Sequence, residues 1–217
     1  MRETRAIALV VLLVALALPA RAGASVLTFS SGSASGAGSF QGDFTNGNDV
    51  ALFYFDLTED AIFQASTTSG GNGGFDPMLT LLSVDASNRL TWIADNDDSP
   101  LGGPDALIVD PLTDRPGRRL KAGRYALALT QTLNYFDPLR GGFAFDDDPF
   151  YACAFLGVED GPCTGFVGPT GAASPHFDVR YDITPVSQPS PVPEPASLTL
   201  FGAGLAGIVV RCRRRKA

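Results

Sequence analysis

Short segments of alternating polar and apolar residues make up the middle of this chain, and clusters of glycine, proline, asparagine and aspartate separate them. A period of two residues is typical of a β-strand with one buried face, and no stretch between the two termini has a convincing helical period. In the segment 50–57, this alternation places Phe53 and Phe55 on the core face. Nine such segments together predict an all-β sandwich: 26–29, 40–44, 50–57, 62–67, 78–84, 90–94, 106–109, 125–131 and 177–183.

The N-terminus has the pattern of a secretory signal. Arg2 and Arg5 precede the apolar stretch 6–18, and small residues at the spacing that signal peptidase reads follow Pro19. Ala20-Arg21-Ala22 and Ala22-Gly23-Ala24 both fit this spacing, so cleavage after Ala22 and cleavage after Ala24 remain open. We assign residues 1–24 to a signal helix and 25–185 to one exported β-sandwich domain.

The C-terminus has the pattern of a short membrane anchor. A proline-rich spacer, 186–195, leads into the apolar segment 196–210, for which we predict a transmembrane helix. Fifteen residues give roughly 22 Å of helix against a hydrocarbon core of about 30 Å, so this anchor is marginal. A basic tail, 211–217, should stay cytoplasmic because of the membrane-stop residues Arg211, Arg213, Arg214, Arg215 and Lys216.

The motif Pro193-Glu194-Pro195, the short span and the basic end occur in the order of the PEP-CTERM sorting signal, which this tail resembles. The resemblance implies a precursor that signal peptidase and an exosortase-type enzyme process, with a transient membrane anchor. The protein would then reach the cell surface or the extracellular space. The alternative is an ordinary single-pass tail anchor that is never cut.

The exported region is strongly acidic. Between Ser25 and Pro195 there are 22 acidic and 8 basic residues. Such a surface repels nucleic acid and anionic lipid headgroups, which excludes nucleic-acid binding, and it favours divalent cations, cationic partners or simple solubility.

Two of the three cysteines, Cys153 and Cys163, lie in the exported region and bound a short segment rich in glycine and proline. In an oxidising envelope this arrangement predicts a local disulfide. A zinc pair is the alternative, although His176 is the only histidine that could join it. The third cysteine, Cys212, lies in the basic tail.

A cluster of oxygen ligands follows the predicted strand 90–94. Calcium prefers six to eight hard oxygens, which this acidic loop can supply, and the candidate ligands are Asp95, Asp97, Asp98 and Asp105. The loop is not an EF-hand, since Pro100 stands where glycine is required and Ala106 where a bidentate glutamate is required. A solvated acidic turn remains the alternative.

Other acidic residues give weaker signals. Asp76, in the Phe75-Asp76-Pro77 turn, either caps the amides of Gly73 and Gly74 or donates an oxygen to the acidic loop. The run Asp146-Asp147-Asp148 favours solvated side chains, since three adjacent carboxylates cannot all face one ion. No Gly-x-Ser-x-Gly elbow accompanies His176, and no spacing singles out a carboxylate pair, so we predict no catalytic residue.

Several segments between about residues 40 and 138 resemble a family of PEP-CTERM proteins marked by a Phe-Asp-Pro motif and, more distantly, the bacterial pre-peptidase C-terminal domain. The segments that carry the resemblance are 49–55, 74–79, 96–98, 123–127 and Thr130-Gln131. The resemblance implies a jelly-roll-like antiparallel β-sandwich and, from the pre-peptidase relatives, a calcium site that would fall on Asp95, Asp97 and Asp98.

Two functional classes follow. The first is a non-catalytic surface or matrix protein that binds polysaccharide through exposed aromatic side chains, for which Trp92, Tyr135, Phe136 and Phe143 are candidates. The second is an envelope hydrolase that uses two carboxylates about 5 to 10 Å apart in a cleft. The long segment 134–175 is either an elaborated functional loop or partly mobile.

Overall fold

The computed structural model describes residues 24–98, 103–110, 115–152, 165–168 and 171–186. All of them except Val186 belong to one compact unit that ends at Pro185. Apart from a single 3-10 turn, η1 (Gly70–Asn72), and one helical turn at Tyr151 and Ala152, the regular structure of the described residues is β. Among these residues no helix is long and apolar enough to cross a membrane.

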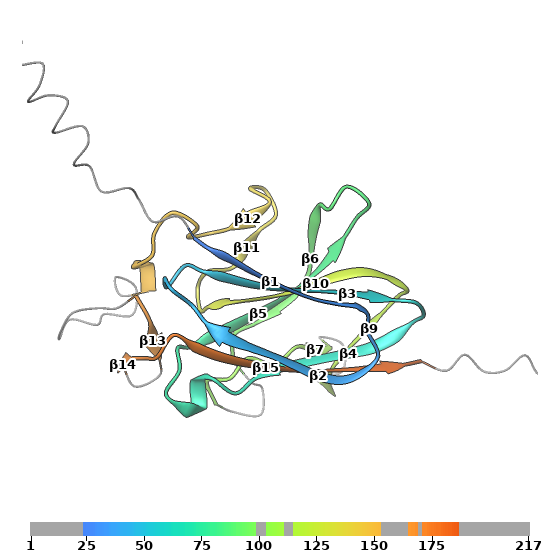
Figure 1. Cartoon of the computed structure of the whole chain (residues 1–217), viewed down its shortest axis with the longest axis horizontal. Helices are drawn as coiled ribbons and strands as arrows, with labels where there is room; N and C mark the ends of the chain where they lie inside the picture. Colours follow the sequence, from blue (N-terminus) through green and yellow to red (C-terminus); the bar gives the residue numbers. More distant parts are fainter. Residues whose placement is uncertain (1–23, 99–102, 111–114, 153–164, 169–170, 187–217) are drawn as a thin grey trace, which may run out of the picture. The chain divides into compact units, whose positions relative to one another are not determined.

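The first sheet has five strands in the order β1-β3-β10-β5-β6 (Figure 1). Four of them pair antiparallel, whereas β1 pairs parallel with β3, Val26 opposite Val50. The strands are β1 (Val26–Ser33), β3 (Val50–Leu57), β10 (Gly123–Gln131), β5 (Pro77–Val84) and β6 (Leu90–Asn96).

The second sheet has four antiparallel strands in the order β2-β15-β4-β9. The long last strand, β15, pairs with β2 on one side and with β4 on the other, so residues from both ends of the domain lie together in this sheet. The strands are β2 (Gly36–Asp43), β15 (His176–Pro185), β4 (Ala61–Thr67) and β9 (Arg118–Leu120).

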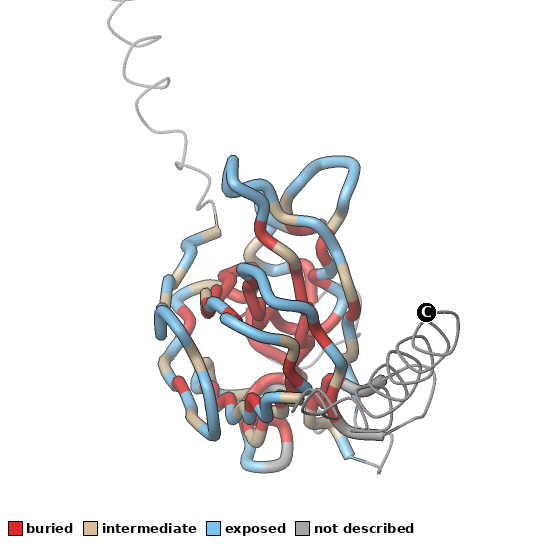
Figure 2. Tube along the Cα trace, turned by 90° about the vertical axis from the view of Figure 1, so that its right-hand side faces the viewer, coloured by how far each residue is buried: buried red, intermediate tan, exposed pale blue. Residues whose placement is uncertain are grey.

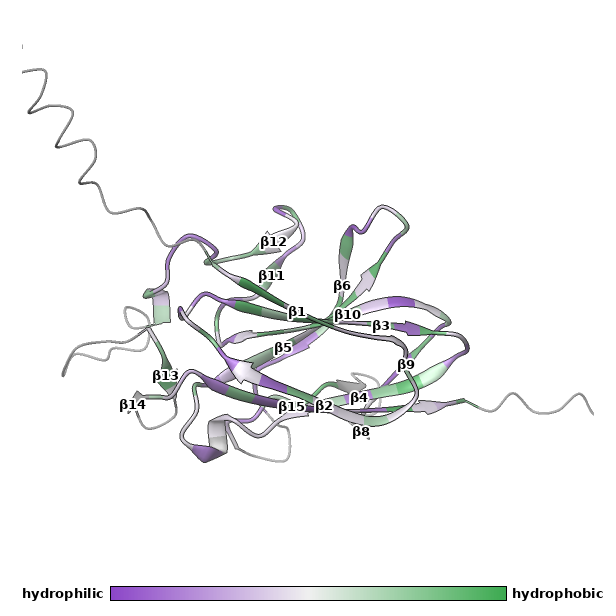
Figure 3. Ribbon diagram, in the orientation of Figure 1, coloured by the Kyte–Doolittle hydropathy of each residue, from purple (hydrophilic) through white to green (hydrophobic). Residues whose placement is uncertain are grey.

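The two sheets pack face to face around one aromatic core (Figures 1 and 2). Phe55 of the first sheet stacks on Phe63 of the second, with ring centroids 4.7 Å apart, and Phe53 stacks on Phe40 at 5.2 Å. Offset stacking of this kind adds to the area that each ring buries. The fold therefore depends on apolar residues at every second position of strands from both sheets, which Figure 3 shows as green bands along the strands.

The outer face of the first sheet is also covered. A short hairpin of β11 (Phe136–Asp137) and β12 (Gly142–Phe143) packs over Val50, Leu52 and Ala128. Phe136 and Phe143 meet edge to face, with ring centroids 5.6 Å apart. Part of the segment 134–175 is thus a structural cover of the sheet.

Small two-residue strands complete the described structure. These are β7 (Val109–Asp110) with β8 (Arg115–Pro116), and β13 (Val167–Gly168) with β14 (Gly171–Ala172).

The predicted all-β fold is confirmed, and eight of the nine predicted segments are observed as strands with ends shifted by a few residues. The ninth, 106–109, overlaps β7 and contains an isolated bridge at Leu107. The prediction of a fully antiparallel sandwich is wrong at β1 and β3. Because β2 lies in the opposite sheet, the chain crosses over before it returns as β3, which makes the two neighbours parallel. The predicted signal helix and transmembrane helix lie outside the described residues.

Candidate functional site

A half-buried carboxyl group, that of Asp76, marks one candidate site at the start of β5. The Asp76 backbone N–H donates to the Val167 carbonyl at 2.9 Å, and its carbonyl accepts from the Thr132 N–H at 2.8 Å. These two bonds hold the residue between β10 and the segment 165–168. The side-chain Oδ1, in contrast, is buried and has no hydrogen-bond partner among the described residues. A proton or a cation at this oxygen would offset the lost hydration.

The Asp76 side chain belongs to an acidic group with Asp97, Asp98 and Asp105. Burial first, and then the negative charges of Asp98, Asp97 and Asp105, raise the pKa of Asp76 from 3.8 to about 6. Both causes disfavour the charged form. Three of the four predicted calcium ligands thus act electrostatically on Asp76.

Asp97 and Asp105 make different local contacts. Thr132 Oγ1 donates to Asp97 Oδ2 at 3.4 Å. Asp105 Oδ1 accepts from the Gly70 N–H at 3.0 Å and from Thr67 Oγ1 at 3.2 Å, so Asp105 caps the turn that contains η1.

The fourth predicted ligand, Asp95, is exposed on β6 opposite Thr80. It is not among the carboxylates that raise the Asp76 pKa. Among the described residues, no three His, Cys, Asp or Glu side chains converge closely enough to hold a metal ion. The calcium assignment therefore stays a prediction.

Two buried polar side chains, those of Gln131 and Tyr151, lie beside Asp76. Gln131 Nε2 donates to the Gly165 carbonyl at 3.0 Å, and its Oε1 accepts from the Val167 N–H at 2.8 Å. Tyr151 Oη lies 2.9 Å from the Thr132 carbonyl oxygen. Burial raises the pKa of Tyr151, which keeps its hydroxyl protonated and able to donate. The family resemblance includes Gln131 but gives it no role, and nothing in the sequence pattern singles out Tyr151, because a buried polar residue at a strand end gives no periodic signal.

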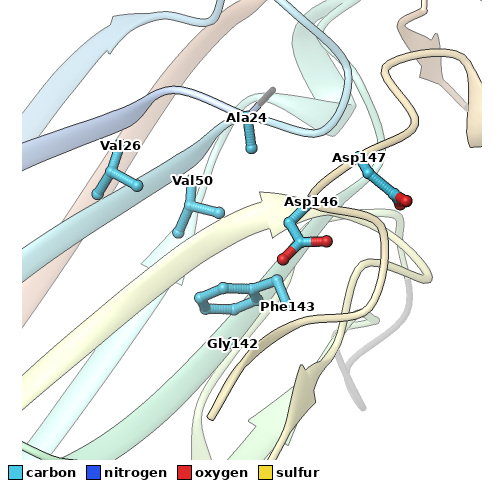
Figure 4. A pocket seen from close by; sticks show the side chains of 7 residues that line it. All are labelled: Ala24, Val26, Val50, Gly142, Phe143, Asp146 and Asp147. Atoms are coloured by element: carbon cyan, nitrogen blue, oxygen red, sulfur yellow. The ribbon is translucent and has the colours of Figure 1, made fainter. Parts of the chain in front are cut away.

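A second candidate site is an apolar hollow of about 480 Å³ at the start of β1 and β3 (Figure 4). Ala24, Val26, Val50 and Phe143 line it, together with Asp146 and Asp147. In Figure 4 the Asp146 carboxylate lies beside Phe143, while the Asp147 side chain points away from it.

The acidic run 146–148 does not act as one unit. Arg140 Nη2 lies 3.2 Å from Asp146 Oδ1 in an ion pair, and Asp148 Oδ1 accepts from the Phe150 N–H at 3.0 Å. His176 Nδ1 lies 3.1 Å from Asp43 Oδ1, and within the described part of the chain this is the one hydrogen bond of its ring. No described serine hydroxyl is paired with His176 for nucleophilic chemistry.

The predicted aromatic contact surface is partly wrong. Phe136 and Phe143 are only 4% and 7% exposed because they cover the outer face of the first sheet. Trp92 and Tyr135 remain exposed, at 47% and 50%. Trp92 pairs with Leu82, whose side chain belongs to the outer cluster of this sheet, and Tyr135 directly precedes β11.

Several predicted site residues lie outside the described residues. These are the disulfide candidates Cys153 and Cys163, the sorting motif Pro193, Glu194 and Pro195, and the membrane-stop residues Arg211, Arg213, Arg214, Arg215 and Lys216.

Comparison with known families identifies the tail. Residues 191–215 match the PEP-CTERM protein-sorting motif. The motif predicted from Pro193-Glu194-Pro195, the short apolar segment and the basic end is therefore confirmed. It implies an exported protein whose precursor is anchored in the membrane. No curated protein sequence matches the chain.

Solved structures with a similar chain path have low sequence identity. One is the pre-peptidase C-terminal domain of a collagenase from Bacillus anthracis, with 10% identity and a TM-score of 0.36 over 72% of this chain and 94% of that one. A second is a periplasmic inhibitor of g-type lysozyme from Aeromonas hydrophila, with 10% identity and a TM-score of 0.37 over 74% and 98%. A third is a surface-associated copper-binding protein of Methylomicrobium album BG8, with 10% identity and a TM-score of 0.33 over 75% and 100%.

Proposed function

We propose that this chain is a non-catalytic protein of the cell surface or extracellular matrix, which an exosortase-type enzyme processes and releases from a transient membrane anchor. The observation that carries the proposal is the PEP-CTERM motif at residues 191–215. Signal peptidase removes the N-terminal segment, and the basic residues after 210 keep the tail on the cytoplasmic side of the inner membrane. The span of 15 residues is too short for a stable permanent anchor, which suits a transient one.

Replacement of Pro193, Glu194 and Pro195 by alanine tests the sorting step. In the cells that make the protein, this variant should accumulate at full length in the inner membrane fraction, whereas the wild-type protein should reach the surface or the medium. Pro189→Ala, outside the matched residues, is the matched control and should behave like wild type. Normal release of the triple-alanine variant would contradict the proposal.

We further propose that the acidic group binds one calcium ion through Asp97 and Asp98, with Asp76 in place of Asp95 and with Asp105 or a backbone carbonyl completing the shell. Because these side chains do not converge in the described structure, the ion would have to draw them together. Two observations support this. Asp76 Oδ1 is buried without a hydrogen-bond partner among the described residues, and burial first, then the negative charges of Asp98, Asp97 and Asp105, raise the Asp76 pKa. A divalent cation would satisfy the oxygen and neutralise the repulsion.

Thermal unfolding with and without calcium tests this site. Millimolar calcium added to chelator-treated protein should raise the melting temperature, because an ion that binds only the folded state stabilises it by mass action. Asp97→Ala should abolish the rise, while Asp147→Ala, an acidic residue outside the group, should keep it. If calcium raises the melting temperature of Asp97→Ala as much as that of wild type, the acidic group is a solvated turn and not a calcium site.

The proposed ligand of the sandwich is a polysaccharide that contacts Trp92 and Tyr135. Both aromatic side chains are about half exposed, which suits stacking on sugar rings. The purified protein should bind at least one member of a polysaccharide panel in the presence of calcium, and Trp92→Ala with Tyr135→Ala should weaken that binding. Phe150→Ala is the matched control, since Phe150 is exposed as well, at 56%.

An envelope hydrolase is the second candidate, and one observation favours it. A carboxyl group with a pKa of about 6, such as Asp76, is protonated often enough near neutral pH to act as a general acid. Hydrolysis of any panel polysaccharide by wild type and not by Asp76→Asn would support this function in place of the first.

A further inference from the structure

The first residues of the folded domain lie against a buried carboxylate, that of Asp49. Its side chain is fully buried. Oδ1 accepts from the Ser25 backbone N–H at 2.7 Å, and Oδ2 accepts from the backbone N–H groups of Thr45 at 2.7 Å and Asn46 at 2.9 Å. Three backbone donors thus converge on one carboxylate at the start of β1 and β3.

No cation accompanies this carboxylate within the described residues. The ion pairs found there involve Asp43, Asp56, Asp60 and Asp146, not Asp49. The neighbouring Asn48 Oδ1 is also buried and lacks a hydrogen-bond partner among the described residues. Asn46 Nδ2 also donates to Asp49 Oδ1 at 3.4 Å, so this carboxylate is supplied with hydrogen bonds. Its charge still has no counter-ion among the described residues, and a buried charge without one is costly.

The position of the Ser25 nitrogen is fixed from both sides. The Ser25 carbonyl accepts from the Val50 N–H at 3.0 Å, which sets the parallel register of β1 against β3. The turn before Asp49 cannot shift easily, because the backbone oxygens of Gly165 and Pro149 approach Gly47 so closely that no side chain would fit there.

We propose that signal peptidase cuts after Ala24, and that the new α-ammonium group of Ser25 forms an ion pair with the buried carboxylate of Asp49. Cleavage would thus complete the fold by supplying the missing cation at the start of β1. The inference rests on the export proposed above and decides between the two cleavage sites that the sequence leaves open.

The geometry favours this cut over the one after Ala22. A nitrogen 2.7 Å from a carboxylate oxygen is at the distance of a charge-assisted hydrogen bond, and an ammonium brings three donors where an amide brings one. In a chain that begins at Gly23, the Ser25 amide occupies this position and keeps the charged amine away from it.

Loss of Ala24 leaves no carbonyl unpaired at this end. The Ala24 N–H donates to the Asp146 carbonyl at 2.9 Å, but Asn48 Nδ2 also donates to that oxygen at 3.1 Å and remains after the cut. The carboxylates of Asp146 and Asp147 line the hollow beside Ala24 and add to the negative potential around the new amine, although Arg140 partly neutralises Asp146.

N-terminal sequencing of the mature protein from exporting cells tests the cleavage site. Wild-type protein should begin at Ser25. Ala24→Phe removes the small residue directly before this cut and should abolish the Ser25 terminus, whereas Ala20→Phe alters only the site before Gly23 and should leave it. A wild-type terminus at Gly23 would overturn the inference, and a terminus that keeps the whole signal would instead contradict export itself.

Melting curves of two purified mature forms test the ion pair. At pH 6.5 the form from Ser25 to Ala217 should melt higher, on the order of 2–4 °C, than the form from Gly23 to Ala217 in the same buffer and detergent. An α-amine has a pKa of about 7.7–8.0 when unfolded, and Asp49 should raise it in the folded state. The advantage is therefore full below this range and should be lost as the pH rises through the folded value.

Asp49→Asn should remove the difference between the two forms, although it lowers both melting temperatures because Thr45 and Asn46 lose their charged acceptor. Asp147→Asn is the matched control and should preserve the difference. If Asp49→Asn does not fold, the pH dependence of the difference in melting temperature between the two wild-type forms tests the ion pair by itself. A difference that stays constant from pH 6 to pH 10, or is absent at pH 6.5, contradicts the ion pair.

Discussion

The Asp76 carboxyl group shows most directly how the position of a single residue changes its chemistry. Its sequence context, Phe75-Asp76-Pro77, predicted either a cap for Gly73 and Gly74 or an oxygen for the acidic loop. The Gly74 N–H donates instead to the Ser69 carbonyl at 2.8 Å, and the carboxylate that binds this turn is Asp105, which accepts from the Gly70 N–H. The sequence predicted the acidic loop itself and offered Asp76 as one of its oxygens, but it could not decide between this role and the cap, because Asp76 and the loop come from the ends of different strands.

Asp76→Asn should stabilise the calcium-free protein at neutral pH. Since the folded pKa of about 6 lies above the ordinary value of 3.8, the folded state holds the proton longer than the unfolded state. The stability that this proton gives is present at low pH and falls as the pH rises from about 4 to about 6. The shift corresponds to at most about 3 kcal/mol, and solvent around this half-buried group reduces the effect to about 1–2 kcal/mol.

Urea unfolding between pH 4 and pH 8 in a chelating buffer measures this effect. The free energy of unfolding of Asp76→Asn should fall less across this range than that of wild type. Asp95→Asn, which changes an exposed carboxylate outside the group, should follow the wild-type profile. Identical profiles for wild type and Asp76→Asn would show that the charged form of Asp76 does not destabilise the folded state.

At the scale of elements, the long strands were predictable and the cover of the outer sheet face was not. Alternation in the segment 50–57 correctly predicted a core face that contains Phe53 and Phe55. The opposite face of the same strand, with Val50 and Leu52, is buried as well. Two-residue strands such as β11 and β12 are too short for a periodic signal, so their position over this face required the three-dimensional structure.

Phe143→Ala should destabilise the domain by about 3 kcal/mol, since it removes a buried ring and leaves a cavity beneath the hairpin. Phe143 is 7% exposed and packs edge to face on Phe136. Phe150→Ala, at an exposed position, should change the free energy of unfolding by less than about 0.5 kcal/mol. Chemical denaturation of both variants gives the comparison, and equal effects would show that the hairpin does not cover a core.

Cys153 and Cys163 should form a disulfide. Described residues on either side of them, Tyr151 and Ala152 before and Val167 after, belong to one buried cluster and so lie close together. A bond across a loop of this length is worth up to about 3 kcal/mol in the chain-entropy model before native-state strain is subtracted. Mass spectrometry after non-reducing digestion should show one linked peptide. Alkylation of both thiols without prior reduction would exclude the bond.

At the scale of the whole molecule, sequence was the better guide to the destination of the protein than the fold. The tail motif is read from a linear order of residues, 191–215, and needs no tertiary contact. The ligand of the sandwich depends on which exposed side chains share a surface, and the burial of Phe136 and Phe143 shows that composition cannot decide this. The acidity of the exported region fits the proposed function.

The mass of the mature protein from its own cells tests the central claim most directly. If an exosortase-type enzyme processes the chain, the surface or extracellular form ends near Pro195 and lacks the basic residues Arg211 to Lys216. Intact-mass and C-terminal peptide analysis should therefore find no peptide from residues 211–217 in that fraction, while the membrane fraction retains it. A surface protein whose mass includes the complete tail would contradict the account.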